Sequence, residues 1–193
     1  MPLSEPAART AKHVRTIVCE GYLRDDGLWD VEGHLIDTKG YDFDNAERGT
    51  IHAGEHVHEM WLRLTVDDQY EIHEVEAVTD YAPFGICGDV APVFQQLVGL
   101  KIAPGWNLAA RKLVGGVAGC THIVELLGPL GTTVLQTIRP SQKPDAQRGK
   151  KKGVSMDESK EGKRPRVIDT CHALRADGPV VERHWPDWYE GRD

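Results

Sequence analysis

The chain has 193 residues, of which 40% are hydrophobic, and its formal net charge is −7. This length and composition fit one folded domain with a real core and exclude a chain that is disordered throughout. The charge is uneven, because residues 139–166 carry a net +6 and the rest of the chain −13. An acidic body argues against general nucleic-acid binding, which needs a basic surface.

Residues 14–80 carry the signals of two β-hairpins. VRTIVCEGYL and LWDVEGHLIDT flank an Asp-Gly turn at 25–27, and HVHEMWLRLTVD and YEIHEVEAVTD flank a turn at 67–69. The polar, glycine-containing residues 39–54 between the hairpins predict a loop. We therefore expect an antiparallel sheet of about four strands.

The pattern after residue 80 changes to helical spacing. DVAPVFQQLVGL, PGWNLAARKLVGG and AGCTHIVELLGPLGTTVLQTI predict three helices, the third kinked or split at Gly128–Pro129. The fold class is therefore α+β. No run of about 18 apolar residues is present, so the sequence predicts no membrane span.

The C-terminal part of the chain divides into two segments. Residues 139–166 contain few apolar side chains, which predicts a flexible basic loop. Residues 167–193 regain apolar and aromatic residues, which predicts a segment that packs on the main domain of residues 1–138. The basic loop on an acidic body is a candidate docking segment for a protein partner.

The cysteines and the N-terminus indicate the compartment. The start of the chain, MPLSEPAARTAKHVR, lacks the apolar core of a signal peptide. No CxxC pair is present among the four cysteines, which are Cys19, Cys87, Cys120 and Cys171. We expect a soluble, cytoplasmic protein whose reduced thiols are core residues, ligands or nucleophiles.

The third helix, residues 118–138, begins with side chains that are able to bind a metal ion or a substrate. His122, Glu125, Thr132 and Gln136 follow helical spacing on one face, and Cys120 precedes them at the positive end of the helix dipole. Thiolate, imidazole and carboxylate together suit zinc better than magnesium or calcium. The alternative is that Cys120 or Thr121 caps the helix and that the other side chains face solvent.

A second candidate cluster is GEHVHEMW. His56 and His58 are two residues apart at a strand start, so both are expected on one face of the sheet, where they would form half of a metal site. Glu55 or Glu59 could supply a ligand or a general base. The alternative is a histidine-rich strand edge at the surface.

Two weaker clusters complete the candidates. Cys171 adjoins His172, and both could reach one centre from a turn. Asp30, Glu32 and His34 share one strand face, which is either a polar site or the solvent side. Phosphate-binding glycine motifs and a GxSxG elbow are absent from the sequence.

Long blocks of the sequence resemble a known family. GYLRDDGLWDVEGHLIDTK, GEHVHEMWLRLTVD, GLKIAPGW and GGVAGCTHIVELL are similar to a bacterial family catalogued as domain of unknown function number twenty-eight eighty-nine, over about residues 13–138. TCHALRADGPVV is similar to the tail of that family. The resemblance implies cytoplasmic proteins of bacteria that degrade aromatic or similarly hydrophobic compounds, and it carries over no catalytic residues.

A fainter, fold-level resemblance links ICGDVAPVFQQLVGLKI and GCTHIVELL to the U-type iron–sulfur scaffold proteins. Those proteins pair an antiparallel sheet with helices and place metal-binding cysteines at the start of two of them. The resemblance implies that Cys87 and Cys120 meet at one site, with Asp89 or His122 assisting. Cys171 is the candidate for a third thiol.

Two functional hypotheses follow. The first is a metal-dependent hydrolase or lyase that binds zinc or iron and acts on a small molecule, with aromatic compounds as the candidate class. Its candidate ligands are His58, Cys87, Cys120, His122, Glu125 and Cys171. Glu59 is the candidate base, and Arg63 and Gln136 are candidates for orienting the substrate. The second hypothesis is a non-enzymatic metal or sulfur carrier that depends on its cysteines, and a purely structural module is the remaining alternative.

Overall fold

The structure of the protein is a computed structural model that describes residues 3–141, 162, 164–165 and 167–191. The chain forms two compact units, residues 1–138 and 139–193, and each is described here by itself. Most of the basic segment 139–166, which was predicted to be a flexible loop, lies outside the described residues.

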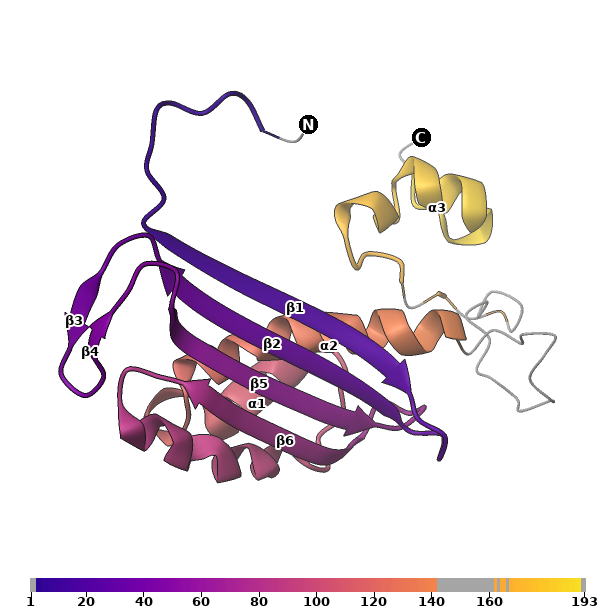
Figure 1. The fold of residues 1–193 in the computed structure, drawn as a ribbon. Coiled ribbons are helices and arrows are strands. Elements are labelled where there is room, and N and C mark those ends of the chain that lie inside the picture. Colours follow the sequence, from indigo (N-terminus) through magenta and orange to yellow (C-terminus); the bar gives the residue numbers. More distant parts are fainter. Residues whose placement is uncertain (1–2, 142–161, 163, 166, 192–193) are drawn as a thin grey trace. The chain divides into compact units, whose positions relative to one another are not determined.

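The first unit is built on a four-stranded antiparallel sheet with the order β1-β2-β5-β6 (Figure 1). Its strands are β1 (His13–Leu23), β2 (Trp29–Lys39), β5 (His56–Val66) and β6 (Ile72–Tyr81). Both predicted hairpins are present, and the order shows that the second hairpin pairs with the first through β2 and β5. The prediction of a four-stranded antiparallel sheet is confirmed.

The connection between the hairpins contains a small hairpin of its own. β3 (Phe43–Asn45) and β4 (Gly49–Ile51) pair in a separate two-stranded sheet, so the prediction of a plain loop was wrong. The Asn45 side chain accepts hydrogen bonds from the backbone N–H groups of Glu47 and Arg48, which stabilises a turn too short for the strand pattern to reveal.

The helices follow the sheet, as predicted, with two differences in detail. They are the 3₁₀ stretch η1 (Gly85–Leu97), α1 (Trp106–Val114), the short η2 (Gly116–Ala118) and α2 (Thr121–Ser141). The first predicted helix is a 3₁₀ stretch that contains Pro92, which lacks the N–H that a regular α-helix requires. The third is not split at Gly128–Pro129, because α2 is a single helix of 21 residues.

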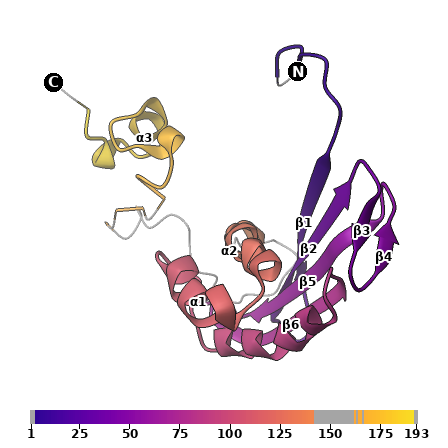
Figure 2. The same ribbon diagram turned by 90° about the vertical axis from the view of Figure 1, so that its left-hand side faces the viewer.

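Within the first unit, η1, α1 and α2 pack on one face of the sheet, and no described element of this unit covers the other face (Figure 2). In β2 the alternate positions Trp29, Val31 and Leu35 are buried, and they join one core with Leu126, Leu127 and Leu130 of α2. Gly33 allows this close packing, because a Cβ there would meet the side chains of Leu126 and Leu130 at 3.2–3.3 Å. The two faces of the sheet therefore differ. One is apolar and covered by helices, and the other, which we call the open face, carries no helix of this unit.

The C-terminal unit has a small core of its own. Its elements are η4 (His172–Leu174), α3 (Pro179–His184) and η5 (Pro186–Trp188). Ile168, Ala176 and Val181 are buried, and Trp185 and Trp188 pack against them. These two tryptophans thus find packing partners within the unit. Among the described residues, no helix has the length and hydrophobicity needed to cross a lipid bilayer.

Candidate metal site

Asp37 is a carboxylate at a core-facing position of β2, where the alternation of the strand otherwise places apolar side chains. Asp37 follows Leu35 in the alternation of β2 and therefore points to the helix-covered face, where only 1% of its side chain is exposed. A buried carboxylate needs charged or hydrogen-bonding partners. The side chains that supply them come from three other elements.

Arg15 of β1 is the principal partner of Asp37. Its Nε and one Nη each donate a hydrogen bond to Asp37, both at 2.8 Å, in a bidentate pair. His13, two residues earlier on the same strand, places Nε2 3.2 Å from Oδ1 of Asp37. The edge strand β1 therefore fixes the orientation of the carboxylate.

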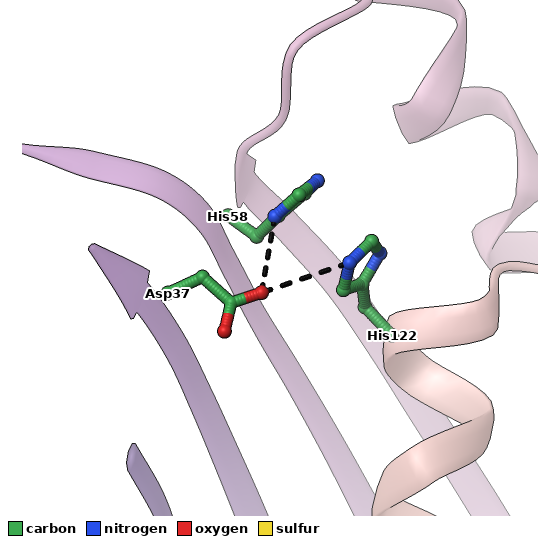
Figure 3. A group of neighbouring side chains, drawn as sticks. All are labelled: Asp37, His58 and His122. Carbon is green, nitrogen blue, oxygen red and sulfur yellow. Dashed lines mark hydrogen bonds and ion pairs between the residues drawn. The ribbon is translucent and has the colours of Figure 1, made fainter. Parts of the chain in front are cut away.

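Two imidazoles approach the other oxygen of Asp37 (Figure 3). His58 of β5 donates from Nδ1 to Oδ2 at 3.1 Å, and His122 at the start of α2 places Nε2 3.6 Å from the same oxygen. The two rings stack on each other, with centroids 3.6 Å apart and an interplanar angle of 26°. Both side chains are mostly buried.

Burial and charge set the protonation states of the three groups. Burial alone would raise the pKa of Asp37, but the hydrogen bonds and charge of Arg15 outweigh it and lower that pKa below its usual value. Burial, together with the neighbouring His122, lowers the pKa of His58 to about 4. Burial also lowers the pKa of His122. At neutral pH the group is therefore one carboxylate and two neutral imidazoles.

This group can hold a metal ion. One ligand atom from each of Asp37, His58 and His122 lies within 4.8 Å of the other two, and in the part of the chain that the structure describes no other set of three or more His, Cys, Asp or Glu side chains does so. Neutral imidazole and ionised carboxylate are the forms that bind metal ions. The sequence-based prediction of a metal-binding group that includes His58 and His122 thus has a structural counterpart.

Two more predicted ligands lie near His122. Cys120 directly precedes α2, and its Sγ is 3.9 Å from Nδ1 of His122. Glu125 lies one turn further along the helix, half-exposed, and forms an ion pair with Arg111 at 3.5 Å. Cys120 thus adjoins the group without belonging to it, and Glu125 is engaged by a cation of α1.

His56, by contrast, belongs to the opposite face of the sheet. The register shifts by one residue at this point, because His56 pairs with Thr38 and His58 pairs with Asp37. This β-bulge makes Val57 an extra residue, so the two histidines point to opposite faces and the prediction that they share one face was wrong.

Glu59 joins His56 on the open face. It accepts hydrogen bonds from His56 Nδ1 at 2.6 Å and from His34 Nε2 at 2.9 Å. Burial would raise the pKa of Glu59, but these two hydrogen bonds lower it. The predicted general base is therefore an ionised carboxylate between two imidazoles, across the sheet from Asp37.

The remaining predicted site residues lie elsewhere. Arg63 is on the open face, where it pairs with Glu32 and Glu76. Gln136 lies 14 residues beyond His122 in α2, about 21 Å along the helix axis. Cys87 lies in η1, and Cys171 is an exposed residue of the C-terminal unit. None of these four residues belongs to the metal-binding group.

Sequence reasoning missed Asp37, Arg15 and His13 as site residues. A signal for Asp37 was present, because the alternation Trp29, Val31, Leu35 places it on the apolar side of β2. A carboxylate at such a position must have partners in the core. Arg15 and His13 carried no comparable signal, because their role depends on the register between β1 and β2, in which Arg15 lies opposite Asp37.

A family described as "Protein of unknown function (DUF2889)" matches residues 13–136. The matched stretch contains Asp37, His58 and His122, together with both β1 residues that contact Asp37. No significant match was found among the curated proteins or among the solved structures. The resemblance to iron–sulfur scaffolds stays a prediction.

Proposed function

The chain belongs to the DUF2889 family of proteins of unknown function, and we propose that it is a metal-dependent enzyme with Asp37, His58 and His122 as its metal ligands. The observation that carries this proposal is the approach of two neutral imidazoles to one oxygen of a buried carboxylate. Each of the three ligands comes from a different element, so the site forms only when β2, β5 and α2 are assembled.

The separations within the group fit a small divalent ion. Nitrogen and oxygen ligands at about 2.1 Å from a tetrahedral zinc ion lie about 3.4 Å from one another. The distances from Asp37 Oδ2 to His58 Nδ1 and His122 Nε2 are 3.1 and 3.6 Å, on either side of that value. Two of the three separations thus match a tetrahedral zinc site, and the third, between the two imidazoles, is within 4.8 Å.

Arg15 fixes the orientation of the ligand Asp37 without being a ligand itself. Its bidentate pair with Asp37 holds the carboxylate plane, as hydrogen-bonding partners of metal ligands generally do. Both imidazoles are neutral at pH 7, so neither has to release a proton to solvent before a metal binds. The Nδ1 proton of His58 must only move to Nε2 of the same ring, so that Nδ1 can bind the ion. The chain thus supplies ligands that are already in the binding-competent charge state.

Three protein ligands favour catalysis over a structural role. Structural zinc sites are closed by four protein ligands, whereas catalytic sites keep a position for water or substrate. A bound divalent ion would supply a water of lowered pKa and a Lewis acid, which suits a hydrolase or lyase acting on a small molecule. An aromatic substrate is the class that the sequence resemblance implies.

The ligand set is one that zinc and ferrous iron share. We propose zinc, because hydrolase or lyase chemistry needs no redox change and imidazole and carboxylate are ligands of catalytic zinc. The carrier hypothesis receives less support, since it relies on converging cysteines and no cysteine belongs to the metal-binding group that the described residues show.

Metal content tests the proposal directly. Protein purified without a histidine tag, stripped with a chelator and reloaded with zinc or ferrous iron under reducing conditions, should retain one ion per chain by elemental mass spectrometry. H58A and D37N should lose it. H56A is the matched control, because His56 is two residues from His58 on the same strand but faces the other side of the sheet, and it should retain the ion.

The outcomes that contradict the proposal are equally concrete. Failure of the reloaded wild-type chain to hold metal removes the site. Retention of a full equivalent in H58A, with the fold intact by circular dichroism, places the metal elsewhere. A chain that binds the ion through these residues but turns over no ester, phosphoester or hydroxylated aromatic substrate in the zinc or iron form supports the carrier hypothesis instead.

A further inference from the structure

The two outer edges of the sheet differ in their protection. The edge of β6 is covered at its start, because Ile72 exchanges backbone hydrogen bonds with Gly99 and Leu100 and the Gln95 side chain donates to the Val75 carbonyl. No backbone hydrogen bond to the outer edge of β1 is made by any described residue. An unpaired edge of this length is a ready template for another strand.

β1 has few of the features that usually prevent edge pairing. Its eleven residues pair with β2 without a bulge and include neither proline nor lysine, and its inward-pointing charge, Arg15, is engaged by Asp37. Five large apolar side chains of the strand are 37–51% exposed, namely Val14, Ile17, Val18, Tyr22 and Leu23. Natural sheets protect or pair such edges, so this exposure indicates a surface that is covered in the working protein.

We propose that β1 pairs antiparallel with β1 of a second copy of the chain, about a twofold axis at Val18. Val18 is the midpoint of His13–Leu23, so this is the one symmetric register that pairs the strand over its whole length. Two four-stranded sheets would thereby join into one continuous sheet of eight strands. The proposal does not depend on the metal site.

The sequence of β1 is complementary to itself in this register. On the open face, Val18 meets its own counterpart and Val14 lies opposite Tyr22, which is a favourable pair of a β-branched and an aromatic residue. Thr16 lies opposite Glu20. No like charges face each other, and every opposed pair consists of residues from the same face of the strand.

The helix-covered face is compatible as well. Arg15 lies opposite Gly21, so no like charge faces its guanidinium. Ile17 lies opposite Cys19, which are two apolar groups of moderate size. A register centred one residue earlier would set Val14 against Glu20 and leave two residues of each strand unpaired, so the pattern favours the axis at Val18.

A charge placed at the axis tests the interface. The wild-type chain should elute, by size-exclusion chromatography with light scattering, at twice the 21.4 kDa mass of one chain. V18K places two ammonium groups opposite each other and should shift the protein to the single-chain mass. The matched control is V78K on β6, a valine of similar exposure on the same face, which should leave the dimer intact.

A cysteine at the axis tests the register. V18C should form an intermolecular disulfide under mild oxidation, whereas T16C should not, because the two copies of residue 16 are four residues apart along the paired strands. A wild-type protein of single-chain mass overturns the proposal. Dissociation by V78K and not by V18K assigns the contact to the open face instead.

Discussion

Lowering the pH should destabilise the protein because the unfolded chain binds a proton at His58 more readily than the folded chain does. A single substitution of His58 can isolate this effect. The pKa of His58 is about 4 in the folded protein and about 6.5 in an unfolded chain. Between these values the unfolded chain binds a proton that the folded chain does not. This contribution to stability is therefore fully present above pH 6.5 and is lost as the pH falls towards 4.

The size of the effect follows from the pKa difference. A shift of 2.5 pH units at about 1.4 kcal/mol per unit corresponds to roughly 3 kcal/mol. The assay is urea unfolding of wild-type protein and H58Q from pH 7 to pH 4, with a chelator present so that bound metal does not contribute. Glutamine does not titrate and can still donate to Asp37, so the wild-type protein should lose about 3 kcal/mol more than H58Q over this range.

His52 provides a control of opposite sign. It lies on the surface beside Asp42, which raises its pKa, so its contribution to stability is present at low pH and is lost as the pH rises. H52Q should therefore not reproduce the effect of H58Q. Parallel stability curves for wild-type protein and H58Q would refute the idea that His58 is held neutral by its surroundings.

Two further substitutions test the packing that positions the site. L127A removes a fully buried side chain of α2 and should lower the free energy of unfolding by about 2–5 kcal/mol, whereas L108A, at a position that is 63% exposed, should change it by less than about 0.5 kcal/mol. G21A should cost about 1–3 kcal/mol, because the added methyl group would overlap the Thr137 side chain where α2 crosses β1. Gly88 has open space around it, so G88A is the matched control. Urea unfolding measures all four, and equal effects within either pair would contradict the packing described.

The sheet could be predicted because its signals are local. The turns at 25–27 and 67–69 combine glycine or acidic side chains with strand alternation on both sides, and both hairpins have those turns. The side chain of Asp67, for example, accepts hydrogen bonds from two backbone N–H groups of its own turn. Contacts of this kind depend on neighbours in the sequence and are therefore visible in it.

The site could be predicted only in part, because it depends on contacts between distant strands. His122 and His58 were recognised by residue type, but their common partner Asp37 is 85 and 21 residues away from them, respectively. The pairing register of β2 with β1 and β5 brings these residues together. The bulge that separates His56 from His58 likewise has no marker in the sequence HVH.

The bulge in β5 also bears on how chain length can vary at this position. Because Val57 is the extra residue, the histidines on either side of it already match the consecutive residues Thr38 and Asp37 of β2. A related chain that lacks this residue would read His-His rather than His-x-His and would still deliver one imidazole to each face. Comparisons among relatives should therefore align these histidines by strand register, and a one-residue gap between them is compatible with an unchanged site.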